Sequence, residues 1–123
     1  MAETEYKISI DRVMSVYGDF AGEEEARKSS AFCRSAVLSL EAMLDKTKPL
    51  AKNDYQICYA AACLAYYRYT LFNADTTESV RAGDVTVRSQ MNVIVINAEK
   101  LLKDALSSIA PLLRSKGFAF AGV

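Results

Sequence analysis

Apolar residues recur along this chain mainly at helical intervals. The clearest case is the segment from residue 23 to 46, where apolar positions four residues apart form one stripe, Phe32, Ala36, Leu40 and Leu44. Such a stripe predicts an amphipathic helix that packs one face on a core. Glutamates at 23–25 stand where the positive end of a helix dipole favours acids, and Pro49 follows the segment. The pattern therefore predicts one long helix over 23–46.

Two further long helices are predicted in the second half of the chain. Residues 55–72 are apolar on nearly every face, which is typical of a central helix packed on several sides. Asn53 is the expected N-cap, with Gln56 three residues later as in a capping box. The stretch 89–113 carries an apolar stripe made of Ile94, Ala98, Leu101, Ala105, Ile109 and Leu112. Pro111 is expected to kink or end this last helix, because proline lacks a backbone donor.

A short helix is predicted near the N-terminus. Asp11 is a suitable N-cap, and Val13, Met14 and Tyr17 follow at helical spacing. Gly18 is expected to end this helix after two turns.

The segment 76–89, "TTESVRAGDVTVRS", predicts a β-hairpin. Gly83 and Asp84 fit a two-residue type II′ turn, in which glycine takes the first central position. With that turn, one face of the ribbon carries Val80, Ala82, Val85 and Val87, and the other carries Arg81 and Thr86. Because an isolated two-stranded ribbon is only marginally stable in water, its apolar face is expected to be covered.

The expected fold is thus mainly α, a bundle of three long helices plus a short N-terminal helix, with one small β-hairpin between the last two long helices. No linker divides the chain, so residues 1–123 are expected to form a single helical domain. Residues 117–123 are expected to form a C-terminal tail containing Phe118 and Phe120. These aromatic residues either fold back on the core or add to a neighbouring molecule.

Composition adds an excess of apolar surface to this picture. The chain is 51% hydrophobic with a mean hydropathy of +0.04, which is rich for 123 residues and predicts apolar surface left over for partners. Fifteen basic and fifteen acidic residues cancel. However, residues 1–25 hold seven acids against two bases, either as a solvated acidic end or as part of a dipolar subunit that stacks head to tail.

The sequence offers little for catalysis or metal binding. It has no histidine, and its glycines are scattered singly without a phosphate-binding loop. Cys33, Cys58 and Cys63 are expected to be small buried hydrophobes in a reducing compartment, without a secretory leader. The most apolar run, 59–67, is too short to span a membrane. We therefore expect a protein that is not an enzyme and has no cofactor, no metal site and no membrane association.

Taken in order, these elements resemble the head–tail connector proteins of phages and prophages, also called head completion or adaptor proteins. The resemblance rests on the succession of "YYRYTLFN" at 66–73, "AGDVTV" at 82–87, "NAEKLLKDALSSIAPLL" at 97–113 and "GFAF" at 117–120.

The resemblance implies a non-enzymatic virion protein that forms a ring of about a dozen subunits at the virion neck, after synthesis in the bacterial host cytoplasm. Its partners would be copies of itself, the portal protein and a stopper or tail-completion protein, and DNA would pass through without sequence-specific contact. The candidate subunit or portal interface consists of Val80, Arg81, Val85, Val87, Tyr66, Tyr69, Phe118 and Phe120. The tyrosines are expected either at the rim of the core or at such an interface.

A second hypothesis is a small helical binding or regulatory domain. It would hold an apolar ligand or a partner helix in a groove lined by Tyr59, Leu64 and Tyr66. This hypothesis predicts a pocket of several hundred cubic ångströms with a few inward polar groups.

Overall fold

The computed structural model describes the backbone of residues 6–80 and 85–114, and the side chains of residues 6–73 and 93–114. Five α-helices account for most of these residues: α1 (Ile10–Ala21), α2 (Glu23–Lys28), α3 (Ser30–Met43), α4 (Asp54–Val80) and α5 (Val85–Ser108). Two short 3-10 turns, η1 (Ala51–Asn53) and η2 (Ala110–Leu112), precede α4 and follow α5. The prediction of a mainly α bundle is confirmed, and the described residues contain no β-strand.

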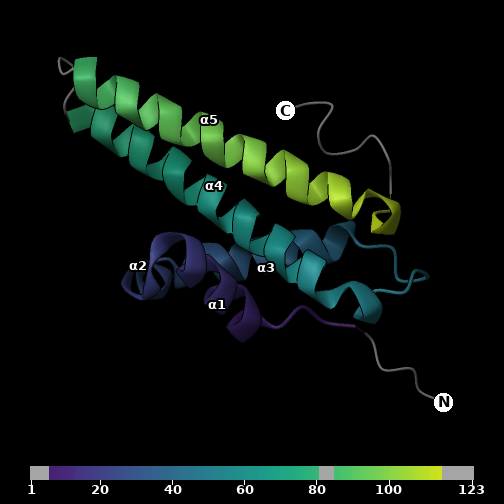
Figure 1. The fold of residues 1–123 in the computed structure, drawn as a ribbon. Helices are drawn as coiled ribbons and strands as arrows, with labels where there is room; N and C mark the ends of the chain where they lie inside the picture. Colours follow the sequence, from purple (N-terminus) through teal and green to yellow (C-terminus); the bar gives the residue numbers. More distant parts are fainter. Residues whose placement is uncertain (1–5, 81–84, 115–123) are drawn as a thin grey trace.

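Helix α4 is the central element, as its all-round apolar character predicts. It packs against α1, α3 and α5, and α5 runs alongside it for most of its length (Figure 1). The segment 60–63 is Ala-Ala-Ala-Cys, and each of these residues is fully buried. Small side chains let three neighbouring helices approach the α4 backbone closely, which explains why the central helix is rich in alanine rather than leucine.

The pair formed by α4 and α5 extends beyond the other helices (Figure 1). At 1.5 Å per residue, the 27 residues of α4 span about 40 Å, whereas the 14 residues of α3 span about 21 Å. Helix α3 runs antiparallel to α4, because Arg68 donates to Ser39 and Ser35 while Phe32 lies against Phe72 farther along. The end of α4 beyond Phe72 therefore extends past the start of α3 and has α5 alongside it (Figure 1).

The C-terminal end of α5 is tied to the connection between α3 and α4. Leu44 and Leu113 form an isolated antiparallel bridge, with Asp45 N donating to Leu112 O at 2.8 Å and Arg114 N to Met43 O at 2.8 Å. Helix α5 ends at Ser108, three residues before Pro111, and the chain continues as η2. The predicted effect of Pro111 is confirmed.

The long helix predicted over 23–46 is wrong in its continuity. Helix α2 stops at Lys28, and α3 begins at Ser30 after a residue with φ −101° and ψ 18°. That residue, Ser29, is fully buried, and its Oγ accepts a hydrogen bond from the Tyr17 hydroxyl at 3.0 Å. The helix is therefore interrupted at a buried polar residue that is hydrogen-bonded to α1. The spacing of apolar residues along the sequence does not indicate this interruption. The helix also ends earlier, at Met43, because Leu44 is extended to pair with Leu113.

The boundaries predicted for the first helix are also wrong. Ser9, not Asp11, is the N-cap, and its Oγ accepts from Arg12 N. Gly18 lies inside α1, and the helix ends at Ala21 with Gly22 as its C-cap, whose φ of +98° is in the region that favours glycine. Asn53, the predicted N-cap of α4, is the residue directly before that helix and also the last residue of η1, and its side-chain amide donates to Pro49 O.

These two glycines give a matched pair of stability predictions. Gly22→Ala is expected to destabilise the protein by about 1 kcal/mol or more, because an alanine is strained at positive φ. Gly18→Ala is expected to be neutral or stabilising by up to about 1 kcal/mol, because an added Cβ would lie 3.8 Å from the Ala26 Cβ within a regular helix. Urea denaturation of both variants tests this, and a less stable Gly18→Ala would contradict it.

The hairpin predicted over 76–89 is not what the structure contains. Helix α4 continues through Val80, and α5 begins at Val85, so both predicted strands are helical. The predicted turn at Gly83 and Asp84 lies outside the described residues. An isolated ribbon is marginal in water, whereas extending an existing helix adds one hydrogen bond per residue without a new nucleus. Helix growth from both sides therefore outweighs the modest β-preference of valine and threonine.

Candidate interaction surface

Most residues of the interface predicted from the sequence lie outside the ranges 6–73 and 93–114, for which the structure describes side chains. Val80 is the last residue of α4, and Val85 and Val87 lie in the first turn of α5. Their shared strand face does not exist, because these residues are helical. Arg81, Phe118 and Phe120 lie outside the described residues, as does the predicted tail 117–123.

Tyr66 and Tyr69 are half-buried and contribute to packing inside the subunit. The Tyr66 ring meets those of Tyr17 and Phe20 on α1, with centroid distances of 5.9 and 5.7 Å. Tyr69 meets Phe32 edge-on at 5.8 Å. Both tyrosines thus lie at the rim of the core, which was one of the two expected positions.

The Tyr69 hydroxyl fastens α4 to α2. It donates to Glu25 Oε1 at 2.7 Å. The hydrogen bond to the Glu25 carboxylate raises the pKa of Tyr69, because an ionised phenol would lose this bond.

The residues predicted to line an apolar groove pack inside the subunit. Leu64 is buried, and Tyr59 meets Phe20 of α1 edge-on at a centroid distance of 5.8 Å. The Tyr66 ring also contacts Phe20.

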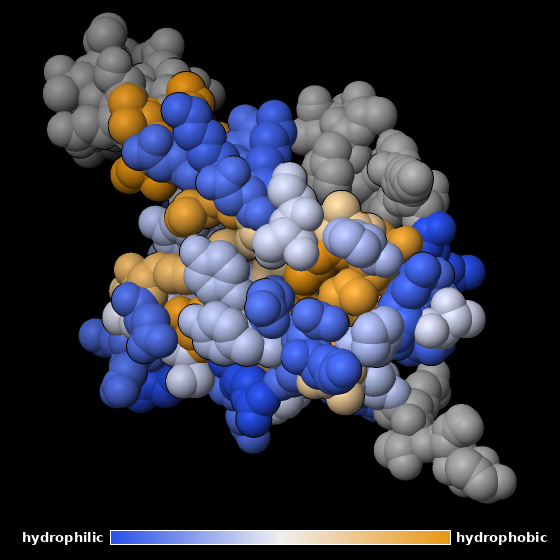
Figure 2. Space-filling model, turned by 45° about the vertical axis from the view of Figure 1, so that its right-hand side comes forward, coloured by the Kyte–Doolittle hydropathy of each residue, from blue (hydrophilic) through white to orange (hydrophobic). Residues whose placement is uncertain are grey.

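The residues that present apolar surface to solvent were not recognised from the sequence as an interface. Among the side chains that the structure describes, seven large apolar residues are exposed: Leu38, Tyr55, Leu71, Phe72, Val93, Ile94 and Ile96. Leu38 on α3 is 68% exposed and Phe72 on α4 is 57% exposed. On the face shown in Figure 2, apolar residues reach the surface in the middle of the molecule, whereas its lower edge is hydrophilic.

Five of these seven residues lie at one level of the α4–α5 pair. Since the two helices are antiparallel and are joined across 81–84, Leu71 and Phe72 are level with Val93 and Ile94, and Ile96 is half a turn farther along. We call these five residues the arm patch. The ring contacts of α1 with α4 are made by Tyr59 and Tyr66, and Leu71 and Phe72 of the arm patch lie farther along α4. At this level the chain leaves apolar residues without full cover.

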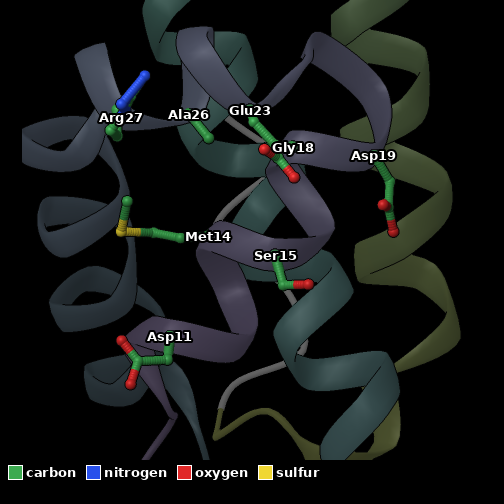
Figure 3. Close-up of a pocket in the computed structure, with 8 residues that line it drawn as sticks. All are labelled: Asp11, Met14, Ser15, Gly18, Asp19, Glu23, Ala26 and Arg27. Carbon is green, nitrogen blue, oxygen red and sulfur yellow. The ribbon is translucent and has the colours of Figure 1, made fainter.

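A hollow of about 580 Å³ opens between α1 and α2 (Figure 3). Met14 contributes an apolar side chain to its lining. Three carboxylates line it, those of Asp11, Asp19 and Glu23, against the single guanidinium of Arg27. We call this region the acidic hollow.

The connection between α3 and α4 has the opposite charge. Residues 45–52 contain Lys46, Lys48 and Lys52, all exposed, against Asp45, and Arg114 lies beside them through its bond to Met43 O. The connection is well ordered by local bonds, since Asp45 Oδ1 accepts from the Thr47 hydroxyl at 2.7 Å and from Thr47 N at 3.0 Å. These bonds lower the pKa of Asp45. We call residues 45–52 with Arg114 the basic end.

The N-terminal segment is fastened at the start of α4. The Tyr6 hydroxyl and the Arg12 guanidinium both bond to the Asp54 carboxylate, and Ile8 N donates to Glu41 Oε2 at 2.8 Å. Burial and the bond to Asp54 raise the pKa of Tyr6. This arrangement holds a chain segment in place, and its tyrosine is too weak an acid to act as a general acid or base near neutral pH.

The three cysteines are free and fully buried, as predicted. Burial raises the pKa of each of the Cys33, Cys58 and Cys63 thiols to about 11. We expect all three thiols to react with an aromatic disulfide reagent at neutral pH at least about a hundredfold more slowly than in the unfolded chain, because little thiolate forms and access is blocked. Absorbance of the released thiol tests this. One fast-reacting cysteine would contradict it.

Over the parts of the chain that the structure describes, no group of three or more cysteine, aspartate or glutamate side chains could hold a metal ion. Within the same segments, no helix combines the length and the apolar character that crossing a bilayer requires. Comparisons with protein-family models, with curated proteins and with solved structures each found no match to this chain.

Proposed function

We propose that this protein is a structural adaptor of a phage or prophage virion, which forms a ring between the portal of the capsid and the tail. The observation that carries this proposal is the exposed apolar surface, above all the arm patch. A solitary molecule gains nothing from leaving five large apolar side chains at one level of a helix pair in contact with water. Burying them against sister copies or a portal would stabilise an assembly by roughly 25 cal/mol for each Å² removed from water.

The shape of the subunit supports the same proposal. A helix pair about 40 Å long that projects from a smaller bundle provides separate surfaces for different neighbours. The arm patch would be covered by one or more neighbours, and the bundle remains available for another. In this proposal the ring is non-enzymatic and needs no cofactor, and DNA passes through it without sequence-specific contact.

The partners of the proposed ring are further copies of the chain, a portal protein and a stopper or tail-completion protein. The tail at 117–123, with Phe118 and Phe120, is proposed as a segment that docks on one of them. The location would be the neck of the virion, after synthesis in the host cytoplasm.

The proposal is tested by combining the purified protein with the portal protein encoded nearest to its gene. Negative-stain electron microscopy of the mixture should show portal rings with an added layer on the tail side. The matched control is Phe72→Glu with Ile96→Glu, which should abolish the added layer while leaving the helical circular dichroism signal unchanged. Bare portal rings at saturating wild-type protein would exclude the proposed function.

A further inference from the structure

We propose that the acidic hollow of one subunit receives the basic end of a second copy of the same chain, so that neighbouring subunits contact each other head to tail. This inference rests on the proposed function for ring closure and deepens it by naming the contact between subunits. It concerns a surface different from the arm patch.

The acidic hollow and the basic end carry opposite charges. The hollow presents three carboxylates against one guanidinium, whereas the basic end presents three lysines and one arginine against one carboxylate. Opposite potentials steer association and fix the register of two surfaces, and like potentials disfavour other arrangements. Two copies would therefore meet hollow to end rather than hollow to hollow.

The α2 side of the hollow lies far from the basic end within one subunit. Helix α2 precedes α3 and the basic end follows it, so Glu23 and Arg27 are separated from the basic end by about the 21 Å length of that helix. Figure 1 shows α2 and the α3–α4 connection at opposite ends of the bundle. Two complementary surfaces at opposite ends of one subunit generate a heterologous contact, which closes into a ring when the rotation between copies allows it.

An exposed aromatic residue lies next to the basic end. Tyr55 follows Lys52 by three positions and is 64% exposed. Its ring stacks on that of Tyr59 with a centroid distance of 6.4 Å and an interplanar angle of 22°, so it is held before any partner arrives. Tyrosine is enriched among the residues that dominate binding energy, and the hollow has the volume and the apolar Met14 to accept such a ring.

Local electrostatics points the same way at both surfaces. Asp19 lies in the last turn of α1, which contains no basic residue, and Lys52 lies just before the first turn of α4. A carboxylate at a helix C-terminus and a cation at a helix N-terminus are both disfavoured by the helix dipole. Each charge would be compensated when the two surfaces meet.

The contact is tested by reversing the charges of each surface separately. One variant carries Asp19→Lys with Glu23→Lys, and the other carries Lys48→Glu with Lys52→Glu. All four positions are exposed, so the fold should tolerate the changes. The control, Arg34→Glu with Lys100→Glu, makes the same charge change as the Lys48→Glu, Lys52→Glu variant, at exposed sites on α3 and α5 outside both surfaces.

Sedimentation velocity at high protein concentration and low salt measures self-association. We expect wild type and control to associate, and each reversed variant alone to associate at least about tenfold more weakly. An equimolar mixture of the two reversed variants should recover association to within about threefold of wild type, because each then offers the charge that the other needs. Raising the salt concentration should weaken all of these contacts.

Three results would overturn the inference: a wild type that stays monomeric under these conditions, reversed variants that associate like the control, or a mixture that does not recover. Asp19→Asn with Glu23→Gln checks that any loss comes from charge rather than misfolding, and it should weaken association in the same direction. If wild type decorates portal rings but charge reversal changes nothing, the contact is wrong and the proposed function stands. If the charge exchange behaves as expected but no portal is bound, the contact stands and the proposed function fails.

Discussion

Leu40→Ala is expected to lower the free energy of unfolding by about 3 kcal/mol, within the range of roughly 2–5 kcal/mol observed when a fully buried leucine is truncated. Leu40 is fully buried on α3, which packs against the central helix α4. Removal of its side chain leaves a cavity that close-packed neighbours cannot fill. Urea denaturation of wild type and variant measures the loss.

The matched control for this change lies two residues earlier on the same helix. Leu38 is 68% exposed, so Leu38→Ala is expected to change the free energy of unfolding by less than about 0.5 kcal/mol. If the two variants lost similar stability, the orientation of α3 in the structure would be wrong. If Leu38→Ala instead weakened assembly, the exposed side of α3 would join the interaction surface.

The second large effect is expected at alkaline pH. Burial raises the pKa of Tyr17 to about 12 from its ordinary value of 10.0, and those of Cys33, Cys58 and Cys63 to about 11 from 9.0. The folded state therefore holds these protons more tightly than the unfolded chain does. The corresponding stability is complete below pH 9 and is lost as the pH rises from 9 toward 12.

With each of four groups contributing on the order of 1 kcal/mol, the loss is comparable to the total stability of a small domain. We expect the protein to unfold in this alkaline range. The loss of the far-ultraviolet circular dichroism signal of its helices measures the unfolding. Tyr17→Phe should flatten the pH dependence and cost about 1 kcal/mol at neutral pH, because the buried Ser29 hydroxyl loses its donor. Tyr55→Phe, at an exposed position, is the control and should alter neither property. Unchanged stability up to pH 12 would contradict the assigned burial.

The sequence was most informative where burial alone decides the structure. The apolar character of 55–72 correctly indicated a helix covered on several sides, and Pro111 correctly marked the end of the last long helix. The burial of the three cysteines was predicted from the tendency of free cysteine to act as a small hydrophobe, and it is confirmed. These features depend on the side chains of the segment itself.

Features that depend on contacts distant in sequence could not be predicted in this way. The break at Ser29 requires Tyr17 as a partner, and the early end of α3 requires Leu113. The helical state of 76–80 and 85–89 arises because two neighbouring helices grow into a segment with strand-like alternation. The pattern of apolar and polar residues within one segment does not contain the information that these three features require.

The interaction surface was only partly accessible from sequence. An excess of apolar surface was predicted from composition, but the interface predicted from the sequence includes none of the residues of the arm patch. Ile94 was assigned to the buried stripe of the last helix and is instead 38% exposed. Leu38 carried a usable signal, because it lies about 200° around the helix from the stripe through Leu40. An apolar residue so far from its own stripe is a candidate for contact with another molecule.

The central claim is that the exposed apolar surface of this subunit is covered by sister copies in a ring on a portal. The most direct measurement is cryo-electron microscopy of the protein mixed with the portal protein encoded beside it. The account predicts a closed ring of density on the tail-facing side, with the arm patch of every subunit buried against a neighbour or the portal. Portal particles without added density, or a bound subunit whose Phe72 and Ile96 face open solvent, would contradict it.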